Sequence, residues 1–527
     1  MTQVIATDVL ATASSAGPGA GLTRRVVGGS LWSIGGQCAT LLASLVATPF
    51  VIRFLGTEAY GVLALINILI GYLAFTDMGM GLASTRFGAE AHARRNSDSQ
   101  SEAAVIWTSL LMAAVPALAT AIALALWAPP LVERVLRLPP QLHASAILAL
   151  RLTALGLVAR SLAGVMNTPQ LVRLRMDVYT LITSGTSVVQ ICLVPLVLAL
   201  GGNLVSVVAV IVGANITALI LHAVVSLRLL PALAAPRLKI ELMRPLIRFG
   251  SAVIISSLVG MALTSAEKLM LTRFVSVAAL AHYSIAYTLA NLLVVMPAAM
   301  NQSLLPALSR LQALEDREPL KELYGRALRG NLLWLVPAVA VVVVSARPFI
   351  TLWAGPEYAA EAVVPFYILV AGLVFNVMAF VPHSLLTAVG RTHTIARYHL
   401  AELPPYLIGA VALTYVFGAK GAAVAWSIRV VADAMLLFMA ARRVTGSKFA
   451  LVGFRGYGYA AAIGLLFLPA LIVILKDSSL ALRIGVLLGA LFAHVSLIWR
   501  KELRAEERFW VLASLKGYWD RRFDHKS

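Results

Sequence analysis

Runs of about 20 apolar residues recur along almost the whole chain, and they constrain its fold more than any other feature. A run of this length is what an α-helix needs to cross the hydrocarbon core of a bilayer. The chain has 527 residues, of which 60% are hydrophobic and 13% are charged. A soluble domain is roughly half apolar and about a quarter charged. The sequence therefore predicts a polytopic, all-α integral membrane protein.

About fourteen membrane spans are predicted on this criterion. Those of the first half lie at 28–52, 59–80, 103–128, 142–166, 178–200 and 203–226. Those of the second half lie at 249–272, 280–305, 331–353, 362–387, 398–417, 419–441, 457–475 and 480–499.

The distribution of Lys and Arg predicts the orientation. If the N-terminus is cytoplasmic, the cytoplasmic segments carry about four times as many basic residues as the outer connections. This asymmetry favours a topology with both termini inside and an even number of spans. The outer connections are short, so no soluble outer domain is expected.

Composition also excludes several classes of protein. The net charge of +19 comes from basic residues placed between apolar runs, which suits membrane orientation and anionic headgroups better than nucleic acid. The two cysteines, Cys38 and Cys192, form neither a disulfide framework nor a metal-ligand pattern. The chain carries no phosphate-binding glycine loop, metal-binding histidine cluster or nucleophile elbow, so we expect neither an enzyme nor a metal or organic cofactor.

A weak internal repeat relates the two halves. In each half an Arg-Phe pair ends a span, and a short connection, a Tyr and a helix with a central Asn follow. The anchors are Arg53, Phe54, Tyr60 and Asn67 in the first half, and Arg273, Phe274, Tyr283 and Asn291 in the second. Because both copies begin on the same side, the halves are predicted to be parallel repeats about an axis normal to the membrane.

The predicted organisation is two six-helix lobes and two appended helices. The segments are a disordered cytoplasmic N-terminus at 1–23, an N-lobe at 24–228, a cytoplasmic linker at 229–248, a C-lobe at 249–445, two further spans within 446–500 and a basic, aromatic cytoplasmic tail at 501–527.

Three segments resemble one known family. Residues 54–81, "FLGTEAYGVLALINILIGYLAFTDMGMG", resemble the start of the polysaccharide exporter, or lipid-linked oligosaccharide flippase, family. Residues 266–287, "AEKLMLTRFVSVAALAHYSIAY", and 304–311, "LLPALSRL", resemble its seventh and eighth spans. The resemblance covers most of residues 24–445 and implies the fold of the multidrug/oligosaccharidyl-lipid/polysaccharide exporter superfamily, two six-helix lobes around a central cavity.

The resemblance also implies an activity. A member of this family flips an undecaprenyl-pyrophosphate-linked oligosaccharide repeat unit to the outer leaflet by alternating access, for O-antigen, capsule or exopolysaccharide synthesis. The expected location is the bacterial cytoplasmic (inner) membrane. The expected partners are the lipid-linked substrate, membrane lipids, and the polysaccharide polymerase and chain-length machinery, with the chain itself a monomer. Transport coupled to H⁺ or Na⁺ is possible. The alternative functions are those of a lipid II flippase and of a multidrug/cation antiporter of the same superfamily.

An anionic pyrophosphate-sugar headgroup needs a cation within the membrane, and Arg binds phosphate oxygens bidentately. At 1.5 Å per residue, Arg151 and Arg429 lie near the middle of their spans. Asp433 lies one turn beyond Arg429 on the same helix face. We interpret Arg151, Arg429 and Asp433 as substrate-pathway candidates, with a buried Arg429–Asp433 pair joining helices as the structural alternative.

Three amides, Gln37, Asn67 and Asn291, also lie within spans. They are candidates for hydrogen bonds to sugar hydroxyls, and hydrogen bonds between helices are the alternative.

Four charged residues are candidates for a gate or for ion coupling. Glu267 and Lys268 lie in the outer third of the seventh span and point about 100° apart, so they do not form a salt bridge with each other. Lys268 is expected to reach the outer headgroups. Asp77, in "FTDMGMG", and Arg86 are predicted to form a pair near the cytoplasmic side, with a role at a helix end as the alternative.

Overall fold

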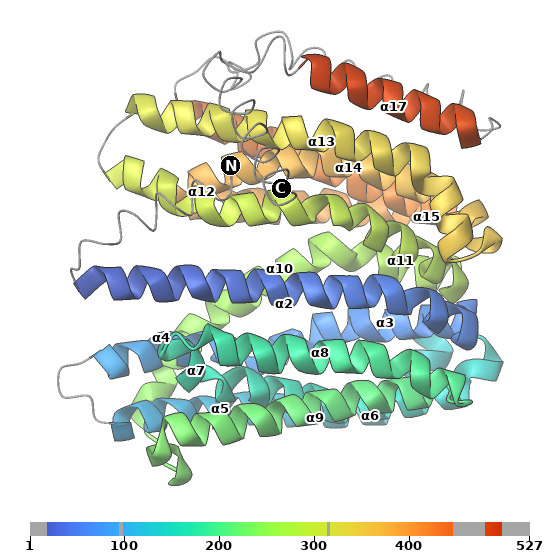
Figure 1. The fold of residues 1–527 in the computed structure, drawn as a ribbon. Helices are drawn as coiled ribbons and strands as arrows, with labels where there is room; N and C mark the ends of the chain where they lie inside the picture. Colours follow the sequence, from blue (N-terminus) through green and yellow to red (C-terminus); the bar gives the residue numbers. More distant parts are fainter. Residues whose placement is uncertain (1–17, 94–98, 137, 314–316, 446–479, 498–527) are drawn as a thin grey trace, which may run out of the picture. The chain divides into compact units, whose positions relative to one another are not determined.

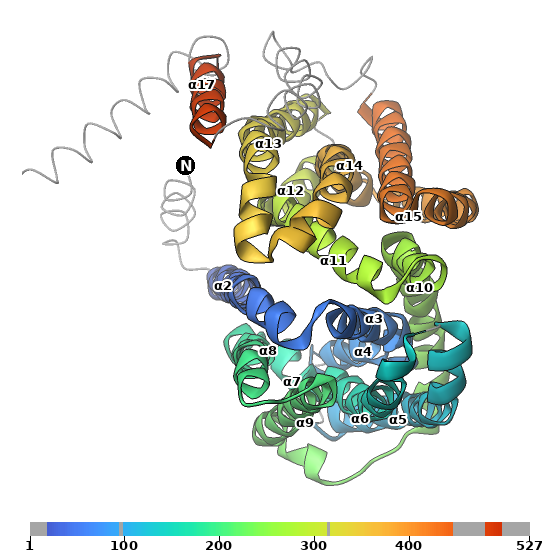
Figure 2. The same cartoon turned by 90° about the vertical axis from the view of Figure 1, so that its right-hand side faces the viewer.

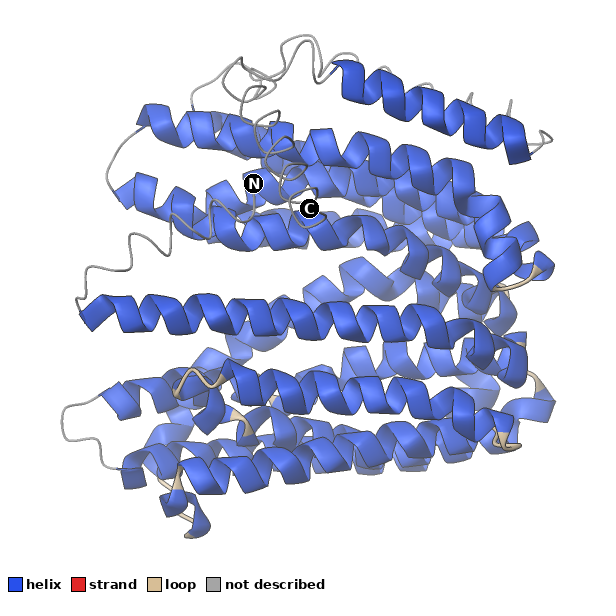
Figure 3. Ribbon diagram, viewed as in Figure 1, coloured by secondary structure: helices blue, strands red, loops and turns tan. Residues whose placement is uncertain are grey.

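Helices run through the whole described structure, as the ribbon in Figure 1 shows. The computed structural model describes residues 18–93, 99–136, 138–313, 317–445 and 480–497. Within these ranges no strand is present (Figure 3). The prediction of an all-α chain is confirmed for this part of the protein.

Contacts group the chain into two compact units, residues 1–284 and 285–527. The α-helices of unit 1 are α2 (Pro18–Leu55), α3 (Thr57–Leu73), α4 (Met80–Ala93), α5 (Ser99–Pro130), α6 (His143–Met166), the single-turn α7 (Thr168–Val172), α8 (Met176–Ala199), α9 (Leu204–Leu229) and α10 (Met243–Phe274). Its short helices are η2 (Ala74–Asp77), η3 (Leu131–Val135), η4 (Pro140–Leu142), η5 (Pro231–Ala234) and η6 (Ile240–Leu242). Helix α11 (Val277–Asn291) begins in unit 1 and ends in unit 2.

The helices of unit 2 that follow α11 are η7 (Leu292–Val294), α12 (Val295–Ala313), α13 (Arg317–Trp353), α14 (Pro356–Ala388), α15 (Thr392–Thr445) and α17 (Leu480–Leu497). Within this unit α14 packs against α12, α13 and α15. The hydroxyl of Ser427 donates to the carbonyl of Ile368 over 2.9 Å, which ties α15 to α14.

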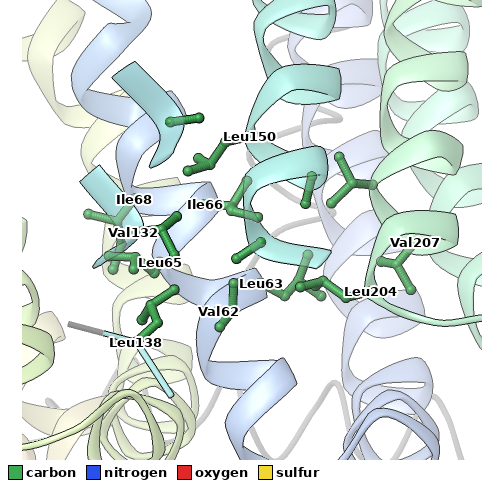
Figure 4. Packing of buried hydrophobic residues seen from close by; sticks show 14 of the residues in the cluster. Val62, Leu63, Leu65, Ile66, Ile68, Val132, Leu138, Leu150, Leu204 and Val207 are labelled. Carbon is green, nitrogen blue, oxygen red and sulfur yellow. The ribbon is translucent and has the colours of Figure 1, made fainter. Parts of the chain in front are cut away.

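In unit 1, α2 packs on α8, α8 on α9, α9 on α6 and α6 on α5, as Figure 2 shows with the helices seen close to end-on. Apolar side chains from α3, α6 and α9 fill the space between these helices. Figure 4 shows Ile66 of α3, Leu150 of α6 and Val207 of α9 in one buried cluster. Because lipid tails are as apolar as these side chains, close van der Waals packing rather than water exclusion holds them together.

The predicted second span, 59–80, is not one continuous helix. Helix α3 ends at Leu73, a short 3₁₀ turn follows, and α4 begins at Met80. The carboxylate of Asp77 accepts the backbone N–H of Gly79 over 2.8 Å, and Gly79 has φ +64°, a left-handed conformation that glycine tolerates best. The motif "TDMGMG" therefore encodes a helix break, which a hydropathy window does not detect.

Helix α15 contains two predicted spans joined at Gly418. Gly418 has φ 59° and ψ −135°, which is not helical, and it separates residues 392–417 from 419–445. The predicted boundary between the spans at 398–417 and 419–441 coincides with this kink. The first half begins at Thr392, six residues before its predicted start.

The predicted eighth span, 280–305, is also interrupted. Helix α11 ends at Asn291, the 3₁₀ turn Leu292–Val294 follows, and α12 begins two residues before Pro297. Proline lacks an N–H and disturbs the preceding turn, so the interruption has a local cause.

By length and composition, ten helices of the described residues qualify as membrane spans, and the shorter apolar helices at 57–73 and 484–496 add to them. The chain is thus a multi-pass membrane protein. The predicted span at 457–475 and the tail at 501–527 lie outside the described residues. The total of fourteen spans and the inside location of both termini stay predictions.

The two units do not coincide with the predicted lobes. The division falls at Ser284, whereas the C-lobe was expected to begin at residue 249. Helix α10 packs against α3 and α4, which explains why the contacts assign it to unit 1. Helix α2 begins at Pro18, so part of the N-terminal segment predicted as disordered is helical.

Candidate functional site in α15

The two halves of α15 bring polar and charged side chains together inside unit 2. The first half contributes His399, Glu402 and Tyr406, and the second half contributes Arg429 and Asp433. We call these five residues the α15 cluster. They come from two segments that the kink at Gly418 folds back on each other, so their proximity depends on the tertiary structure.

Arg429 lies between two aromatic rings. Its guanidinium carbon is 5.8 Å from the ring centre of Tyr406 and 5.9 Å from that of Trp426. The Trp426 ring meets Tyr287 edge to face, with the ring centres 5.7 Å apart. The buried Nε of Arg429 has no hydrogen-bond partner in the described ranges. Aromatic faces stabilise a guanidinium without using its N–H donors, so Arg429 keeps donors for another acceptor.

The two carboxyl groups of the α15 cluster are buried. Glu402 and Asp433 are each 7% exposed. Oδ1 of Asp433 lies 3.6 Å from Nε2 of His399, a distance too long for a hydrogen bond. Among the described residues no N–H or O–H group donates to either oxygen of Glu402 or to Oδ1 of Asp433. The charges that act on Glu402 are those of Asp433, Arg429 and His399.

The predicted ion pair between Arg429 and Asp433 is not formed. Among the described residues Asp433 lies beside His399, with Oδ1 3.6 Å from Nε2, and Arg429 lies against the rings instead. Positions four apart share a helix face, but whether their side chains meet depends on the neighbouring helix. Here the first half of α15 supplies other partners for both side chains.

Arg151 lies on a different kind of surface. It is exposed on α6, and its Nε donates to the carbonyl of Ala125 over 3.3 Å. Leu148 and Leu155, on the same helix face, are 47% and 55% exposed. These apolar neighbours suit contact with lipid tails more than a polar pathway, with the backbone carbonyl satisfying the guanidinium.

Two of the predicted amides lie in unit 1 and the third lies in unit 2. Gln37 of α2 and Asn67 of α3 are exposed in unit 1. The side chain of Asn291 donates to the carbonyl of Tyr287 over 2.8 Å, within its own helix. Asn291 therefore stabilises the last turn of α11, where the 3₁₀ segment begins.

Asp77 and Arg86 do not form the predicted pair. Arg86 binds Glu90 over 3.3 Å and lies over the ring of Phe249, 5.0 Å from its centre. The cation that acts on Asp77 is Arg160. Because its carboxylate accepts the N–H of Gly79, Asp77 stabilises a helix break, which is the helix-end role given above as the alternative to a gate.

Glu267 and Lys268 are both buried, with 0% and 8% exposure. The hydroxyl of Tyr283 donates to Oε1 of Glu267 over 3.2 Å, and Nζ of Lys268 donates to the carbonyl of Thr264 over 3.2 Å. The separate partners agree with the predicted 100° between the two side chains. The expectation that Lys268 reaches the headgroups is wrong, because its ammonium group bends back onto its own helix.

Comparison with known families identifies the chain. A family model described as "Polysaccharide biosynthesis protein" matches residues 50–365, which is more than half of the sequence. The chain belongs to this polysaccharide biosynthesis family. The match begins at the end of α2 and extends into α14, so it includes the segments whose motifs first suggested such a relationship.

Individual relatives agree with the family. A putative O-antigen transporter of Shigella flexneri is 23% identical over 422 residues, covering 78% of this chain and 96% of the relative. The structure of a lipid II flippase in an inward closed conformation matches with a TM-score of 0.70 and 13% identity, covering 89% of this chain and 99% of the flippase. An inward-facing multidrug transporter of the MOP superfamily matches with a TM-score of 0.63 and 14% identity, covering 77% and 94%. At these identities the solved structures show the fold alone, and it is the fold that the sequence predicted.

The sequence analysis did not include His399 and Glu402 among the candidate site residues. The predicted span began at 398, which placed both residues at a helix end, where charges are ordinary. Since the helix begins at Thr392, Glu402 lies ten residues in, roughly 15 Å from the helix start. The spacing of His399, Glu402 and Tyr406 at i, i+3 and i+7 follows one helix face and was the available signal.

Proposed function

We propose that this protein flips an undecaprenyl-pyrophosphate-linked oligosaccharide repeat unit from the cytoplasmic to the outer leaflet of the bacterial cytoplasmic membrane, by alternating access. Membership of the polysaccharide biosynthesis family and the relative described as a putative O-antigen transporter support the class of substrate. The downstream partners would be the polymerase and chain-length machinery that use the flipped unit.

The observation that supports the proposal most directly is the environment of the Arg429 side chain. Arg429 is a half-buried cation within an apolar helix, it lies against two rings, and it has no carboxylate ion-pair partner among the described residues. A pyrophosphate offers several anionic oxygens, and the fork of a guanidinium matches them in a bidentate way. In a low-dielectric setting each such charge-assisted bond is stronger than it would be in water.

The role of Arg429 can be tested by transport. In proteoliposomes, Arg429→Ala should slow flipping of a fluorescent undecaprenyl-pyrophosphate oligosaccharide by about 10- to 100-fold, since a hydrogen bond to a charged group contributes about 1.5–3 kcal/mol. Arg429→Lys should retain part of the activity, because the charge remains while the fork is lost. Arg443→Ala, an exposed site near the end of the same helix, is the matched control.

Two outcomes would contradict the proposal. Wild-type flipping of the oligosaccharide by Arg429→Ala would remove Arg429 from the pathway. Transport of lipid II or of an organic cation, with no flipping of the oligosaccharide by the wild-type protein, would assign another substrate. In cells, deletion of the gene should cause undecaprenyl-linked intermediates to accumulate and surface glycan to be lost.

A further inference from the structure

The connection between α9 and α10, residues 230–242, is fixed against the rest of unit 1. Figure 2 shows it crossing from α9 to α10 past α5. Leu233 is 1% exposed, and its carbonyl accepts the indole N–H of Trp107 over 3.0 Å. The backbone N–H of Lys239 donates to the hydroxyl of Thr108 over 3.2 Å. Packing and these two hydrogen bonds therefore give this segment, the α9–α10 connection, a defined path along α5.

The two hydrogen bonds also indicate the depth of the connection in the membrane. Trp107 and Thr108 lie roughly 12 Å along α5 from its start at Ser99, at 1.5 Å per residue. They follow Glu102, the last charged residue of that helix. Tryptophan is enriched where headgroups meet hydrocarbon. This pattern indicates that the α9–α10 connection lies at that boundary, on the membrane face predicted to be cytoplasmic.

Two large apolar side chains of the connection lie on the surface. Leu238 is 58% exposed and Ile240 is 81% exposed. The backbone of Lys239 between them is extended, with φ −121° and ψ 106°. The two apolar side chains therefore point to one side and the Lys239 side chain points to the other. Because the hydrogen bonds hold the backbone in place, Leu238 and Ile240 stay on the surface, where lipid acyl chains would cover them.

Cations accompany this apolar pair. Residues 228–248 contain five basic residues and one acidic residue. The basic side chains are all exposed, and they are Arg228, Arg237, Lys239, Arg244 and Arg248. Arg237 donates one N–H to Oε1 of Gln100, and since a guanidinium has five such donors, most remain for phosphate oxygens. Long basic side chains rest their stems on apolar surface while their charges reach the headgroups.

We propose that the α9–α10 connection binds an acidic phospholipid of the leaflet that it faces. Leu238 and Ile240 insert among the acyl chains, and Arg237, Lys239 and Arg244 attract the headgroup phosphate. A cluster of basic residues beside a membrane span strengthens binding to anionic lipid. The depth of the apolar pair favours a lipid over an acidic protein, because a protein surface would not reach below the headgroups. The site lies outside the α15 cluster and does not depend on which substrate is transported.

Native mass spectrometry of the full-length protein in detergent tests the headgroup preference. The titrants are phosphatidylglycerol and phosphatidylcholine with the same acyl chains, and the wild type should bind phosphatidylglycerol more tightly. The triple variant Arg237→Gln, Lys239→Gln, Arg244→Gln should bind it about 10- to 100-fold more weakly, since each basic residue near an anionic lipid surface contributes about fivefold.

A second triple variant is the matched control. Arg391→Gln, Arg397→Gln, Arg443→Gln removes the same charge from exposed positions of unit 2 and should leave the affinity for phosphatidylglycerol unchanged. Equal affinity of the wild type for the two lipids would overturn the proposal. Equal losses in the two triple variants would also overturn it, because binding would then follow the total charge of the protein and not this connection.

A fluorescent label at position 240 tests the depth independently. In a Cys38→Ser, Cys192→Ser background, Ile240→Cys labelled with an NBD fluorophore and reconstituted in vesicles should be quenched by lipids brominated on their acyl chains. The same label on Glu318→Cys, a position whose side chain is 82% exposed at the start of α13, should not be quenched by them. An Ile240→Cys label that only aqueous iodide quenches would overturn the proposal and leave this surface to an acidic protein partner.

Discussion

Two buried polar networks of unit 1 and the α15 cluster of unit 2 differ in whether their side chains have partners. Glu102, at the start of α5, is 2% exposed and accepts two bonds from the guanidinium of Arg173, at 2.6 and 3.1 Å. Gln170 donates to the carbonyl of His222 and to the hydroxyl of Ser226, each over 3.3 Å, and its Oε1 lies 3.0 Å from Nδ1 of His222. In both of these networks the buried side chains form hydrogen bonds with one another.

The α15 cluster has the opposite character. Within the part of the chain that the structure describes, no donor reaches either oxygen of Glu402 or Oδ1 of Asp433, and Nε of Arg429 has no acceptor. A paired network contributes to stability and fixes the geometry of its helices. A buried polar network whose groups lack partners lowers stability, and such a cost is typical of sites where a ligand supplies the missing partners during part of the working cycle. The contrast is what a structural role of the unit 1 networks and the proposed ligand-binding role of the α15 cluster would produce.

Breaking the Glu102–Arg173 pair should have the largest effect on stability. Arg173→Ala leaves the carboxylate of Glu102 buried without its main partner and should lower the free energy of unfolding by about 3–5 kcal/mol. Reversible unfolding in mixed detergent micelles measures this change. Arg175→Ala removes an exposed pair with Asp177 and should cost less than about 1 kcal/mol. Equal losses in the two variants would mean that the burial of Glu102 has no energetic consequence.

Inorganic pyrophosphate should sharpen the contrast from the ligand side. Under the proposed function Arg429 is the cation that meets a pyrophosphate, so pyrophosphate should bind the protein and stabilise it against unfolding in mixed micelles by about 2–3 kcal/mol at roughly 100 times its Kd. In Arg429→Ala the addition should have no effect. Equal stabilisation of the two proteins would contradict the arrangement.

Glu402→Gln should have the smallest effect on stability. The substitution keeps the shape of the side chain and removes a buried ionisable group that no donor stabilises, so we expect a change of within about 0.5 kcal/mol or a slight gain. The same micelle unfolding measurement applies. A loss comparable to that of Arg173→Ala would show that Glu402 has a structural partner and would remove the contrast between the two regions.

How far the sequence predicts the site depends on the range of the contacts. The positions of the spans and the boundary at Gly418 follow from local composition. The separate partners of Glu267 and Lys268 follow from helix geometry, since neighbours in a helix point in different directions. The predicted pairs Asp77–Arg86 and Arg429–Asp433 are not formed. Each of these side chains contacts a partner on another segment, which helix geometry alone does not predict.

Local rules therefore account for the class of this protein. A bilayer demands long apolar helices, so hydropathy alone predicts a polytopic all-α chain, and short motifs in residues 54–81 and 266–287 lead to its family. The breaks at Gly79 and Leu292–Val294 arise from the residues that form them, although a hydropathy window passes over both.

The α15 cluster forms only because the kink at Gly418 folds the second half of α15 back along the first. Glu402 and Asp433 stand far apart in the sequence, and the span pattern singles out Asp433 but not Glu402. They become a buried acid pair because the second half of α15 folds back along the first and places a helix face bearing Arg429 against Tyr406. The free energy of a charge depends on its surroundings, and those surroundings come from residues that are distant along the chain.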